Sequence, residues 1–451
     1  MHCDSVVLAA GLGTRMRSSL PKAFHRLGGR ELLVWVEAAC REATGRAPVI
    51  VIGPEMEKAR ELLPPDVTFV VQQERLGTGH ALLQAGKALR DAGDSVLVTT
   101  ADMALLTAKS LRSIVEQQAA HAGALSMLTV VAPEPRGFGR IVRAKNGQVA
   151  RVVEEAEATQ DELRISELNA SVYCYRSAWL WDHLKRLTPS STGEIYLTDL
   201  IGLAADEGQP IASLALSDPD EAIGINTREH LAEAESILRR RVNRAWMVEG
   251  VTITDPATTY IEPGVMLGRD TLLLPNTHLE GATSIGEGCV VGPNSVIRDS
   301  IVGNRCTIEA SFAERAELED DVRVGPFAHL RPGARLLKGV HMGNFGEVKN
   351  STLGPGVKMG HFSYVGDAAI GADTNVGAGT ITCNFSRDGQ KHRTEVGRGA
   401  FLGSDTLLVA PVRVGEGAST GAGSVVTRDV PDQALAVGMP ARVIRSRPAN
   451  A

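Results

Sequence analysis

The chain has 451 residues, and its 47 Lys and Arg against 53 Asp and Glu give a formal net charge of −6. This length predicts two or three domains rather than one. The negative balance argues against a nucleic-acid-binding protein, because such proteins need clustered basic side chains to meet phosphate charge. No run of about 18 apolar residues predicts a membrane span, and no charged-then-apolar signal segment opens the chain.

Six cysteines are scattered along the chain without any Cys-x-x-Cys pair: Cys3, Cys40, Cys174, Cys289, Cys306 and Cys383. Isolated thiols of this kind are typical of small core residues in a reducing compartment. Together with the missing signal segment, they predict a cytoplasmic protein without membrane insertion.

Residues 1–226 alternate short apolar runs with helical patterns. The apolar runs, which predict buried strands, are Val6–Ala10, Val49–Ile52, Phe69–Val71 and Val96–Val98. The helical patterns lie at Glu31–Arg41, His80–Arg90 and Ser110–His121. This alternation predicts an α/β domain with a mostly parallel sheet covered on both faces. Ligands in such folds bind beyond the carboxyl ends of the strands, where Gly11–Arg15 and Asp102 fall.

The first apolar run leads into a glycine-rich loop. Gly11 and Gly13 allow the backbone to approach phosphate oxygens, whose charge exposed N–H groups and Arg15 can meet. The spacing fits neither the Gly-x-x-x-x-Gly-Lys-Ser/Thr loop nor the Gly-x-Gly-x-x-Gly fingerprint, which argues against a kinase or a dehydrogenase. The longer string Leu8–Met16, followed by Leu20-Pro21-Lys22, resembles the signature of sugar-1-phosphate nucleotidyltransferases. Those enzymes join a nucleoside triphosphate to a sugar phosphate and release pyrophosphate.

Residues 227–247 carry apolar side chains at helical spacing behind Thr227, which is a predicted N-cap. We expect one linking helix there.

From Ile261 the chain follows a six-residue period. Aliphatic side chains mark each step: Ile261, Leu267, Leu273, Leu279, Ile285, Val291 and Ile297. The period is lost after Ile297 and returns at Leu318. A hexapeptide period is typical of a parallel β-helix, in which three hexads close one coil, whereas a β-sandwich would need period-two alternation and hairpin turns. Residues 248–451 are therefore expected to form a β-helix with a C-terminal tail, although the spacing does not fix the hand of the coil.

With these repeats behind the nucleotidyltransferase signature, the chain is similar over about residues 4–445 to the family of bacterial bifunctional N-acetylglucosamine-1-phosphate uridylyltransferases and glucosamine-1-phosphate N-acetyltransferases. The resemblance implies a Rossmann-like nucleotidyltransferase domain and a left-handed β-helix. It implies acetyl transfer from acetyl-CoA to glucosamine-1-phosphate and then uridylyl transfer from UTP to N-acetylglucosamine-1-phosphate. The product, UDP-N-acetylglucosamine, supplies peptidoglycan and lipopolysaccharide precursors. Mg²⁺ as cofactor and a homotrimer are also implied.

The matching motifs assign a nucleotidyl-transfer site by resemblance. Arg15 and Lys22 would neutralise the triphosphate, and Asp102 with Asn226 would hold Mg²⁺ through hard oxygen ligands. Further contacts to UTP and the sugar would come from Leu8, Ala9, Ala10, Gly11, Gln72, Gly77, Thr78, Thr100, Ala101, Gly139, Glu154 and Asn169. The chain departs from the family pattern at Arg75, Met103, Ala104, Ala156 and Ala170, which leaves base recognition and sugar tolerance open. An Asp at a strand end can also be only a helix cap.

In the repeats, the resemblance makes His361 the general base, with Glu347 orienting it. An imidazole can take the proton that an amine loses on attacking a thioester. Glucosamine-phosphate and acetyl-CoA contacts would come from Arg331, Lys349, Tyr364, Asn375, Ala378, Asn384, Phe385, Ser404, Ala422 and Arg442. Phe385 stands where the family has Tyr, and Met439 where it has Arg. We expect the site where the hexad count fails, at Asn344–Asn350 and Ile381–Glu395, because solenoids place insertions on their binding face.

Three interpretations follow. The bifunctional enzyme is favoured. The second is a nucleotidyltransferase of altered sugar preference whose β-helix is an inactive trimerising scaffold, and the third is a binding protein without turnover. The joint presence of Arg15, Lys22, Asp102, Asn226, Lys349 and His361 argues against the third.

Overall fold

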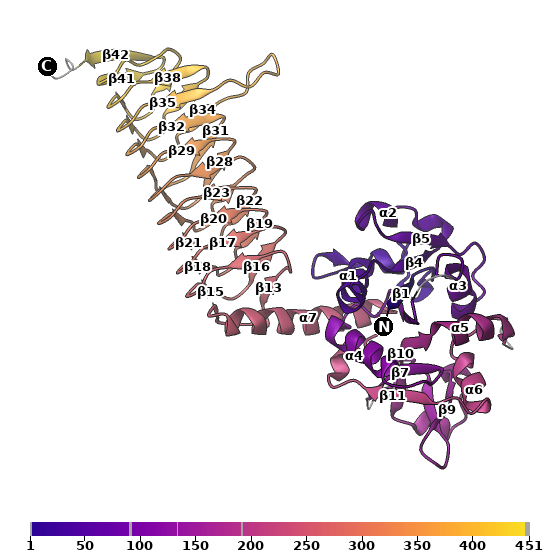
Figure 1. Cartoon of the computed structure of the whole chain (residues 1–451). Helices are drawn as coiled ribbons and strands as arrows, with labels where there is room; N and C mark the ends of the chain where they lie inside the picture. Colours follow the sequence, from indigo (N-terminus) through magenta and orange to yellow (C-terminus); the bar gives the residue numbers. More distant parts are fainter. Residues whose placement is uncertain (1, 90–92, 133, 191–192, 447–451) are drawn as a thin grey trace. The chain divides into compact units, whose positions relative to one another are not determined.

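A computed structural model describes residues 2–89, 93–132, 134–190 and 193–446 of the protein. The chain forms two compact units, Met1–Leu238 and Arg239–Ala451 (Figure 1). Helix α7 (Arg228–Val248) contributes residues to both units. The hydroxyl of Thr227 accepts a 3.1 Å hydrogen bond from the backbone N–H of His230, which is the N-cap expected from the sequence.

The N-terminal unit is built on one sheet with the strand order β11-β7-β10-β6-β1-β4-β5. Its strands are β1 (Cys3–Leu8), β4 (Val49–Ile52), β5 (Thr68–Val71), β6 (Ser95–Thr100), β7 (Leu125–Val131), β10 (Glu167–Arg176) and β11 (Ile211–Ala215). All neighbours pair in parallel except β10, which runs antiparallel to both β6 and β7. A hairpin of β8 (Arg140–Arg143) and β9 (Val149–Val153) attaches to β10. The mostly parallel sheet is confirmed, with one reversed strand inside it.

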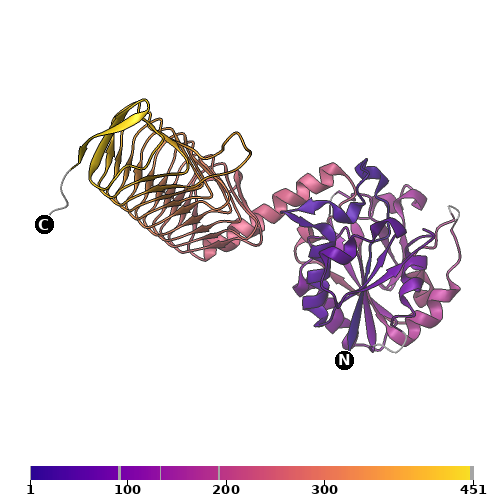
Figure 2. The same ribbon diagram turned by 90° about the horizontal axis from the view of Figure 1, so that it is seen from above.

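Helices cover both faces of this sheet (Figure 2). They are α1 (Leu32–Thr44), α2 (Ala59–Leu62), α3 (Thr78–Ala85), α4 (Ala108–Ala119), α5 (Ser177–His183) and α6 (Asp199–Asp206). Two boundaries differ from expectation. The first strand ends at Leu8, because Ala9 and Ala10 already belong to the turn into the glycine-rich loop. The helix expected at His80–Arg90 ends at Ala85, and Arg90 lies outside the described residues.

The C-terminal unit is a prism with three faces, each a ladder of short parallel strands. The first face holds β12 (Thr252–Ile253), β15 (Leu272–Leu273), β18 (Val290–Val291), β21 (Thr307–Ile308), β24 (Arg323–Val324), β27 (His341–Met342), β30 (Lys358–Met359), β33 (Asn375–Val376), β36 (Phe401–Leu402), β39 (Ser419–Thr420) and β41 (Ala434–Gly438). The final strand β42 (Ala441–Ser446) pairs antiparallel to β41.

The second face holds β13 (Thr259–Ile261), β16 (Thr277–Glu280), β19 (Val296–Arg298), β22 (Phe312–Glu314), β25 (His329–Leu330), β28 (Gly346–Lys349), β31 (Ser363–Gly366), β34 (Ile381–Cys383), β37 (Leu407–Val409) and β40 (Val425–Val426). The third face holds β14 (Met266–Leu267), β17 (Ser284–Ile285), β20 (Ile301–Val302), β23 (Glu317–Leu318), β26 (Arg335–Leu336), β29 (Thr352–Leu353), β32 (Ala368–Ile370), β35 (Thr394–Val396) and β38 (Val412–Val414). The expected parallel β-helix is confirmed.

Coils of unequal length explain where the six-residue count fails. Val296 pairs with His278, 18 residues before it, and with Phe312, 16 residues after it. The loss of period after Ile297 is therefore a shortened coil in an unbroken ladder.

The interruption expected at Asn344–Asn350 is wrong. Strand β28 pairs in register with both β25 and β31, so the chain does not leave the coil there. The interruption expected at Ile381–Glu395 is confirmed: Asn375 pairs with Phe401, 26 residues on, because the loop between β34 and β35 projects from the coil.

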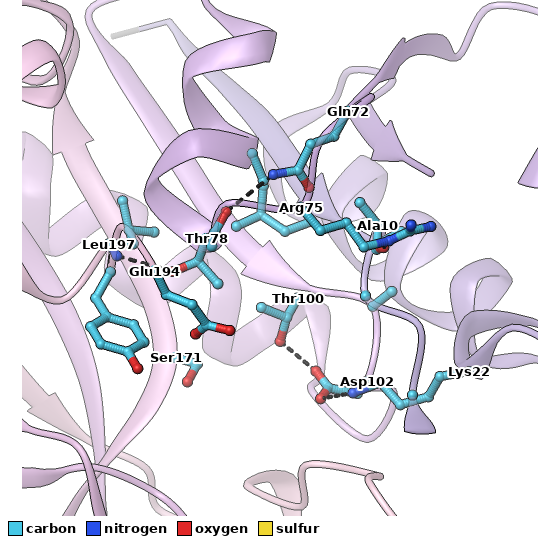
Figure 3. Close-up of a pocket in the computed structure, with 18 of the residues that line it drawn as sticks. Ala10, Lys22, Gln72, Arg75, Thr78, Thr100, Asp102, Ser171, Glu194 and Leu197 are labelled. Carbon is cyan, nitrogen blue, oxygen red and sulfur yellow. Dashed lines mark hydrogen bonds and ion pairs between the residues drawn. The ribbon is translucent and has the colours of Figure 1, made fainter. Parts of the chain in front are cut away.

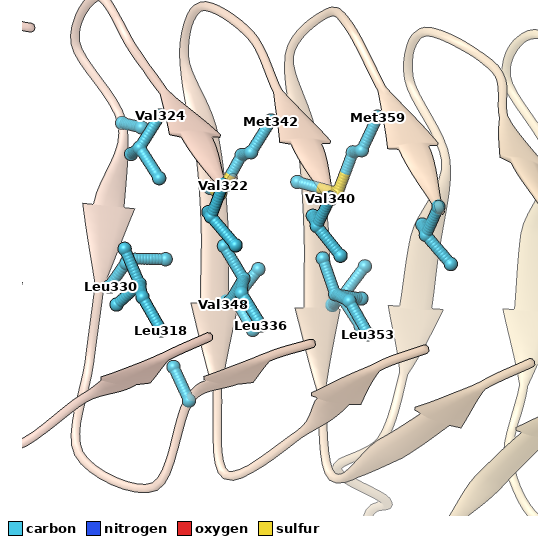
Figure 4. Close-up of a cluster of buried hydrophobic side chains, with 14 of the residues drawn as sticks. Leu318, Val322, Val324, Leu330, Leu336, Val340, Met342, Val348, Leu353 and Met359 are labelled. Atoms are coloured by element: carbon cyan, nitrogen blue, oxygen red, sulfur yellow. The ribbon is translucent and has the colours of Figure 1, made fainter. Parts of the chain in front are cut away.

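The core of the prism consists of aliphatic columns, one side chain per strand (Figure 4). On the third face Leu318, Leu336 and Leu353 stand one coil apart, and Leu336 and Leu353 are fully buried. Burying a leucine side chain contributes about 1.5–3 kcal/mol to the free energy of unfolding. Each column is continuous through the ladder, so a gap in one coil leaves its neighbours without packing partners.

Leu336→Ala should lower the free energy of unfolding by about 2–5 kcal/mol, because it removes transfer free energy and leaves a cavity. Guanidinium denaturation of the full chain, followed by circular dichroism, measures the loss. Arg335→Ala is the matched control: this side chain is exposed, and its ion pair with Glu317 contributes at most about 1 kcal/mol. Equal losses for the two variants would contradict the column as a source of stability.

Candidate functional sites

A cavity of about 560 Å³ opens beyond the carboxyl ends of β1 and β6 (Figure 3). Fourteen of the residues expected at the nucleotidyl-transfer site line it: Leu8, Ala9, Ala10, Gly11, Arg15, Lys22, Gln72, Gly77, Thr78, Thr100, Ala101, Asp102, Glu154 and Asn169. The sheet brings them together because β1 and β6 are parallel neighbours and end at the same edge.

Lys22 joins the two residues expected to hold a cation. Its ammonium Nζ lies 2.6 Å from Asp102 Oδ2 and 2.9 Å from Asn226 Oδ1. Thr100 donates a 2.5 Å hydrogen bond to the other carboxylate oxygen of Asp102. Asn226 does not line the cavity itself, but its amide group reaches the same point through Lys22. Two oxygen ligands from distant parts of the sequence thus converge on one positive charge.

The charge of Asp102 is held by its partners. Burial opposes ionisation, but the Lys22 ammonium and the hydrogen bonds from Lys22 and Thr100 outweigh it, so the pKa of Asp102 lies below its ordinary value. The ion pair is only partly exposed, with 17% and 15% of the two side chains accessible. Asp102 is therefore a carboxylate at neutral pH, ready to bind a cation.

The two loop glycines have different reasons. Gly13 has a left-handed φ of 66°, and a Cβ there would stand 2.5 Å from Cβ of Lys22, so only glycine lets Lys22 approach. A Cβ at Gly11 would meet nothing within 4 Å. Since the fold does not require glycine at that position, its bare backbone is free for a ligand in the cavity.

On the sugar side, Glu154, Asn169 and Gly139 are neighbours. The backbone N–H of Asn169 donates to the carbonyl of Gly139 at 2.9 Å, and Thr198 donates to Glu154 at 3.1 Å. Burial, followed by nearby carboxylates, raises the pKa of Glu154 despite the Thr198 hydrogen bond. The sequence analysis missed Glu194, Tyr196 and Thr198, which line the same wall. They carry no motif, and only the fold places them there.

The base side centres on Gln72 and Arg75. Gln72 lies beside the turn into α3, and Thr78 Oγ1 accepts a 3.0 Å hydrogen bond from Leu197. Arg75, which departs from the family pattern, donates from Nε to the carbonyl of Ala10 at 2.7 Å and pairs with Glu55. A Cβ at Gly53 would collide with this guanidinium. Arg75 is thus tied to the glycine-rich loop.

The other departures lie away from the cavity. Met103, Ala104 and Ala170 are at most 5% exposed and Ala156 is exposed, and none of them lines the cavity.

In the prism, the expected acetyl-transfer residues gather where the first face turns into the second. His361, Ala378, Ser404 and Ala422 each follow a glycine just after β30, β33, β36 and β39. Because these strands pair in register, the four residues form one column with a coil spacing of about 4.8 Å. We call it the corner column. His361 is exposed at its start.

Beside the corner column, the second face carries charged residues one coil apart. Glu347 pairs in register with Tyr364, and Arg331 Nη1 lies 2.8 Å from Glu347 Oε1. The Lys391 ammonium, and then the Arg331 guanidinium, lower the pKa of Lys349. Three cations therefore crowd together, as an anion-binding site requires. Lys391, on the projecting loop, was not among the expected site residues.

No hydrogen bond joins Glu347 to His361 within residues 193–446, so the orienting role of Glu347 stays a prediction. Asn384 Nδ2 lies 3.5 Å from Tyr364 Oη and 2.5 Å from Asp367 Oδ2. A Cβ at Gly366 would strike the Tyr364 hydroxyl at 2.3 Å.

The remaining expected residues lie close by in the fold. Asn375 lies in β33 at the base of the corner column, and Phe385 is exposed on the projecting loop. Arg442 and Met439 are exposed at the β41–β42 end of the prism.

Comparisons with known proteins agree with both units. A family model described as MobA-like NTP transferase domain matches residues 5–191, and one described as bacterial transferase hexapeptide (six repeats) matches residues 258–299. The bifunctional protein GlmU of Geotalea uraniireducens is 43% identical, over 96% of this chain and 95% of its own length. The corresponding protein of Syntrophomonas wolfei is 44% identical over 97% of each chain, and that of Streptococcus agalactiae is 40% identical over 99% and 97%.

A nucleotidyltransferase sheet followed by a hexapeptide prism defines the class: a two-headed transferase that handles nucleotides and acyl groups. The chain belongs to the family of bifunctional GlmU proteins. It is a UDP-N-acetylglucosamine pyrophosphorylase and a glucosamine-1-phosphate N-acetyltransferase, as the first interpretation holds, and we set the other two aside. Among the described residues, no helix is long and apolar enough to cross a membrane.

The lowered pKa of Asp102 predicts a pH-dependent stability. A carboxylate whose folded pKa is lowered contributes stability that is complete above its unfolded pKa of about 3.9 and is lost as the pH falls through the folded value. The free energy of unfolding should therefore fall more steeply from about pH 5 to pH 3 in the wild type than in Asp102→Asn. Urea denaturation across this range measures both slopes. Asp182→Asn, the same change on an exposed carboxylate, should keep the wild-type slope. A wild-type slope in Asp102→Asn would contradict the assignment.

Proposed function

We propose that Asp102 and Asn226 hold Mg²⁺ during uridylyl transfer, and that Arg15 and Lys22 neutralise the triphosphate of UTP. One observation carries the proposal: the Lys22 ammonium bridges the two oxygen ligands and so stands where a cation is favourable. The donor set fits, since Mg²⁺ prefers oxygen and takes one or two protein ligands when phosphates supply others. When bound, the ion neutralises charge on the phosphates.

The chain's own residues provide mainly position and charge. Leu8–Gly11 line the cavity with backbone that a nucleotide can approach, and Glu154 and Asn169 face the sugar side. A phosphate oxygen of N-acetylglucosamine-1-phosphate attacks the α-phosphorus of UTP, and pyrophosphate leaves. Lys22 would then exchange Asp102 and Asn226 for phosphate oxygens. Such a reaction is accelerated by alignment and by stabilisation of developing charge.

For acetyl transfer we propose that His361 takes a proton from the amino group of glucosamine-1-phosphate as the nitrogen attacks the thioester carbonyl of acetyl-CoA. Coenzyme A leaves as the thiol. Arg331 and Lys349 supply positive charge for the sugar phosphate, and the corner column residues Ala378, Ser404 and Ala422 extend from His361 along the path that acetyl-CoA would follow. Tyr364, Asn375, Asn384, Phe385 and Arg442 complete the proposed binding surface.

We also propose a homotrimer formed through the prism. Phe312, Phe327, Phe345 and Phe362 are each more than half exposed, and the rings of Phe327 and Phe345 stack with centroids 5.3 Å apart. Exposed aromatic groups of this size are typical of protein interfaces. They lie on the second face and its corner beside His361, so a neighbouring prism would close over the acetyl-transfer site.

Two substitutions should separate the two activities. Asp102→Ala should lower pyrophosphate release from UTP by about 100-fold or more, and chelation of Mg²⁺ in the wild type should have the same effect, while thiol release from acetyl-CoA persists. His361→Ala should lower thiol release by about 100-fold or more and leave pyrophosphate release unchanged. His341→Ala, which removes another exposed histidine of the first face, is the control. Wild-type pyrophosphate release in Asp102→Ala would refute the metal site, and wild-type thiol release in His361→Ala would refute the base.

Light scattering should give about three times the 47.8 kDa chain mass. The double substitution Phe327→Asp, Phe345→Asp should reduce this toward one chain, because it places charge on the proposed interface. Ile301→Asp makes the same change on an exposed residue of the third face and should leave the mass unaltered. A monomeric wild type would contradict the trimer.

A further inference from the structure

The carboxamide of Gln72, on the base side of the cavity, is held by two groups. Its Nε2 lies 3.2 Å from the carbonyl oxygen of Gly77 and 3.0 Å from Nδ1 of His80. Gln72 is only 3% exposed, and no hydrogen bond engages its Oε1 in the described part of the chain. The remaining polar atom of this cavity-lining side chain is therefore left for a ligand.

The Gly77 carbonyl decides which end of the Gln72 amide faces inward. It also accepts a 3.1 Å hydrogen bond from the backbone N–H of Ala81, in the first turn of α3. Because a carbonyl can only accept, turning the Gln72 amide would set two oxygens against each other. Gly77 cannot move aside, since its φ is 102° and a Cβ there would lie 2.5 Å from the Ile195 carbonyl oxygen. Nε2 of Gln72 therefore donates to both neighbours.

This arrangement fixes the tautomer of His80. If Nδ1 accepts from Gln72, the ring proton of the neutral imidazole lies on Nε2. The amide of Gln84, one helical turn further along α3, lies 3.0 Å from that Nε2. A neutral imidazole has one acceptor nitrogen and cannot accept from both amides, so Gln84 presents its oxygen to His80. The competing contact of the Gln84 amide to the His80 carbonyl is longer, at 3.4 Å.

We propose that His80 and Gln84 are positioning residues that keep Gln72 Oε1 an acceptor inside the cavity, and thereby select uracil over cytosine. Uracil has one donor on its pairing edge, N3–H, whereas cytosine has an acceptor at the same ring position. An acceptor held in place binds the first and opposes the second, and leaving buried polar groups unpaired strengthens discrimination. The proposal rests on the proposed function in one respect, that Gln72 faces the base of UTP.

The test compares kcat/KM for pyrophosphate release with UTP and with CTP, at about pH 8.5 where imidazole is neutral. His80→Phe cannot accept from Gln72, and Gln72→Leu removes the base contact. Each should lower the UTP-to-CTP ratio about 10-fold, the effect of one lost hydrogen bond. The change should appear mainly in KM for UTP, because the base is remote from the reacting phosphorus.

Two substitutions at Gln84 distinguish positioning from a merely structural role. Gln84→Met leaves Gln72 and His80 intact but cannot accept, and it should lower the ratio in the same direction. Gln84→Glu keeps an acceptor toward Nε2 of His80 and should retain the wild-type ratio. Gln117→Met, the same change on an exposed glutamine of α4, should have no effect. Thermal melting of each variant confirms that it is folded.

The outcomes separate the two proposals. If Gln72→Leu loses the ratio while His80→Phe and Gln84→Met keep it, the positioning role is refuted and the proposed function stands. If Gln72→Leu keeps the ratio, Gln72 does not read the base and the inference fails, although pyrophosphate release still supports uridylyl transfer. A wild type without pyrophosphate release from UTP overturns both.

Discussion

The parallel backbone ladder of the prism is the constraint on which the second unit depends. Each strand pairs with the strand one coil before it and the strand one coil after it, so every residue of one coil has a fixed counterpart in the next. The same register that stacks Leu336 on Leu318 in the core stacks Tyr364 on Glu347 at the surface. Packing and chemistry are thus set by one pattern of hydrogen bonds, which no side chain of the site has to provide.

The nucleotidyl-transfer site depends on a balance of charge instead. Asp102 is buried at a strand end, where an isolated carboxylate would be costly, and Lys22 with Thr100 stabilises it. The ammonium reaches Asp102 only because Gly13 has no side chain to block Lys22. A residue of the loop, a residue of the sheet and Asn226 from the far end of the unit therefore form one electrostatic group.

The sequence predicted much of this because its signals are local. Six-residue steps identified the prism, and the strings around Gly11 and His361 identified residues that the fold then brought together. What it missed depends on distance through the fold. Glu194 and Thr198 reach the cavity from a segment without a motif, and Lys391 joins Arg331 and Lys349 only because a loop projects beside them. The expected interruption at Asn344–Asn350 was wrong because polar residues on a regular coil look, in sequence, like an insertion.

The unequal coils have a consequence for how such a protein can change. In a hairpin sheet, adding one residue to a strand turns every later side chain to the opposite face. Here the spacing between paired residues varies from 16 to 18 while the strands keep their partners and their buried columns. The corners absorb the difference. A prism of this kind can gain or lose single residues at its corners, or extend a whole loop as between β34 and β35, without re-sorting inside from outside. Insertions and deletions are therefore tolerated next to the acetyl-transfer residues, where the chemistry can be altered while the scaffold stays intact.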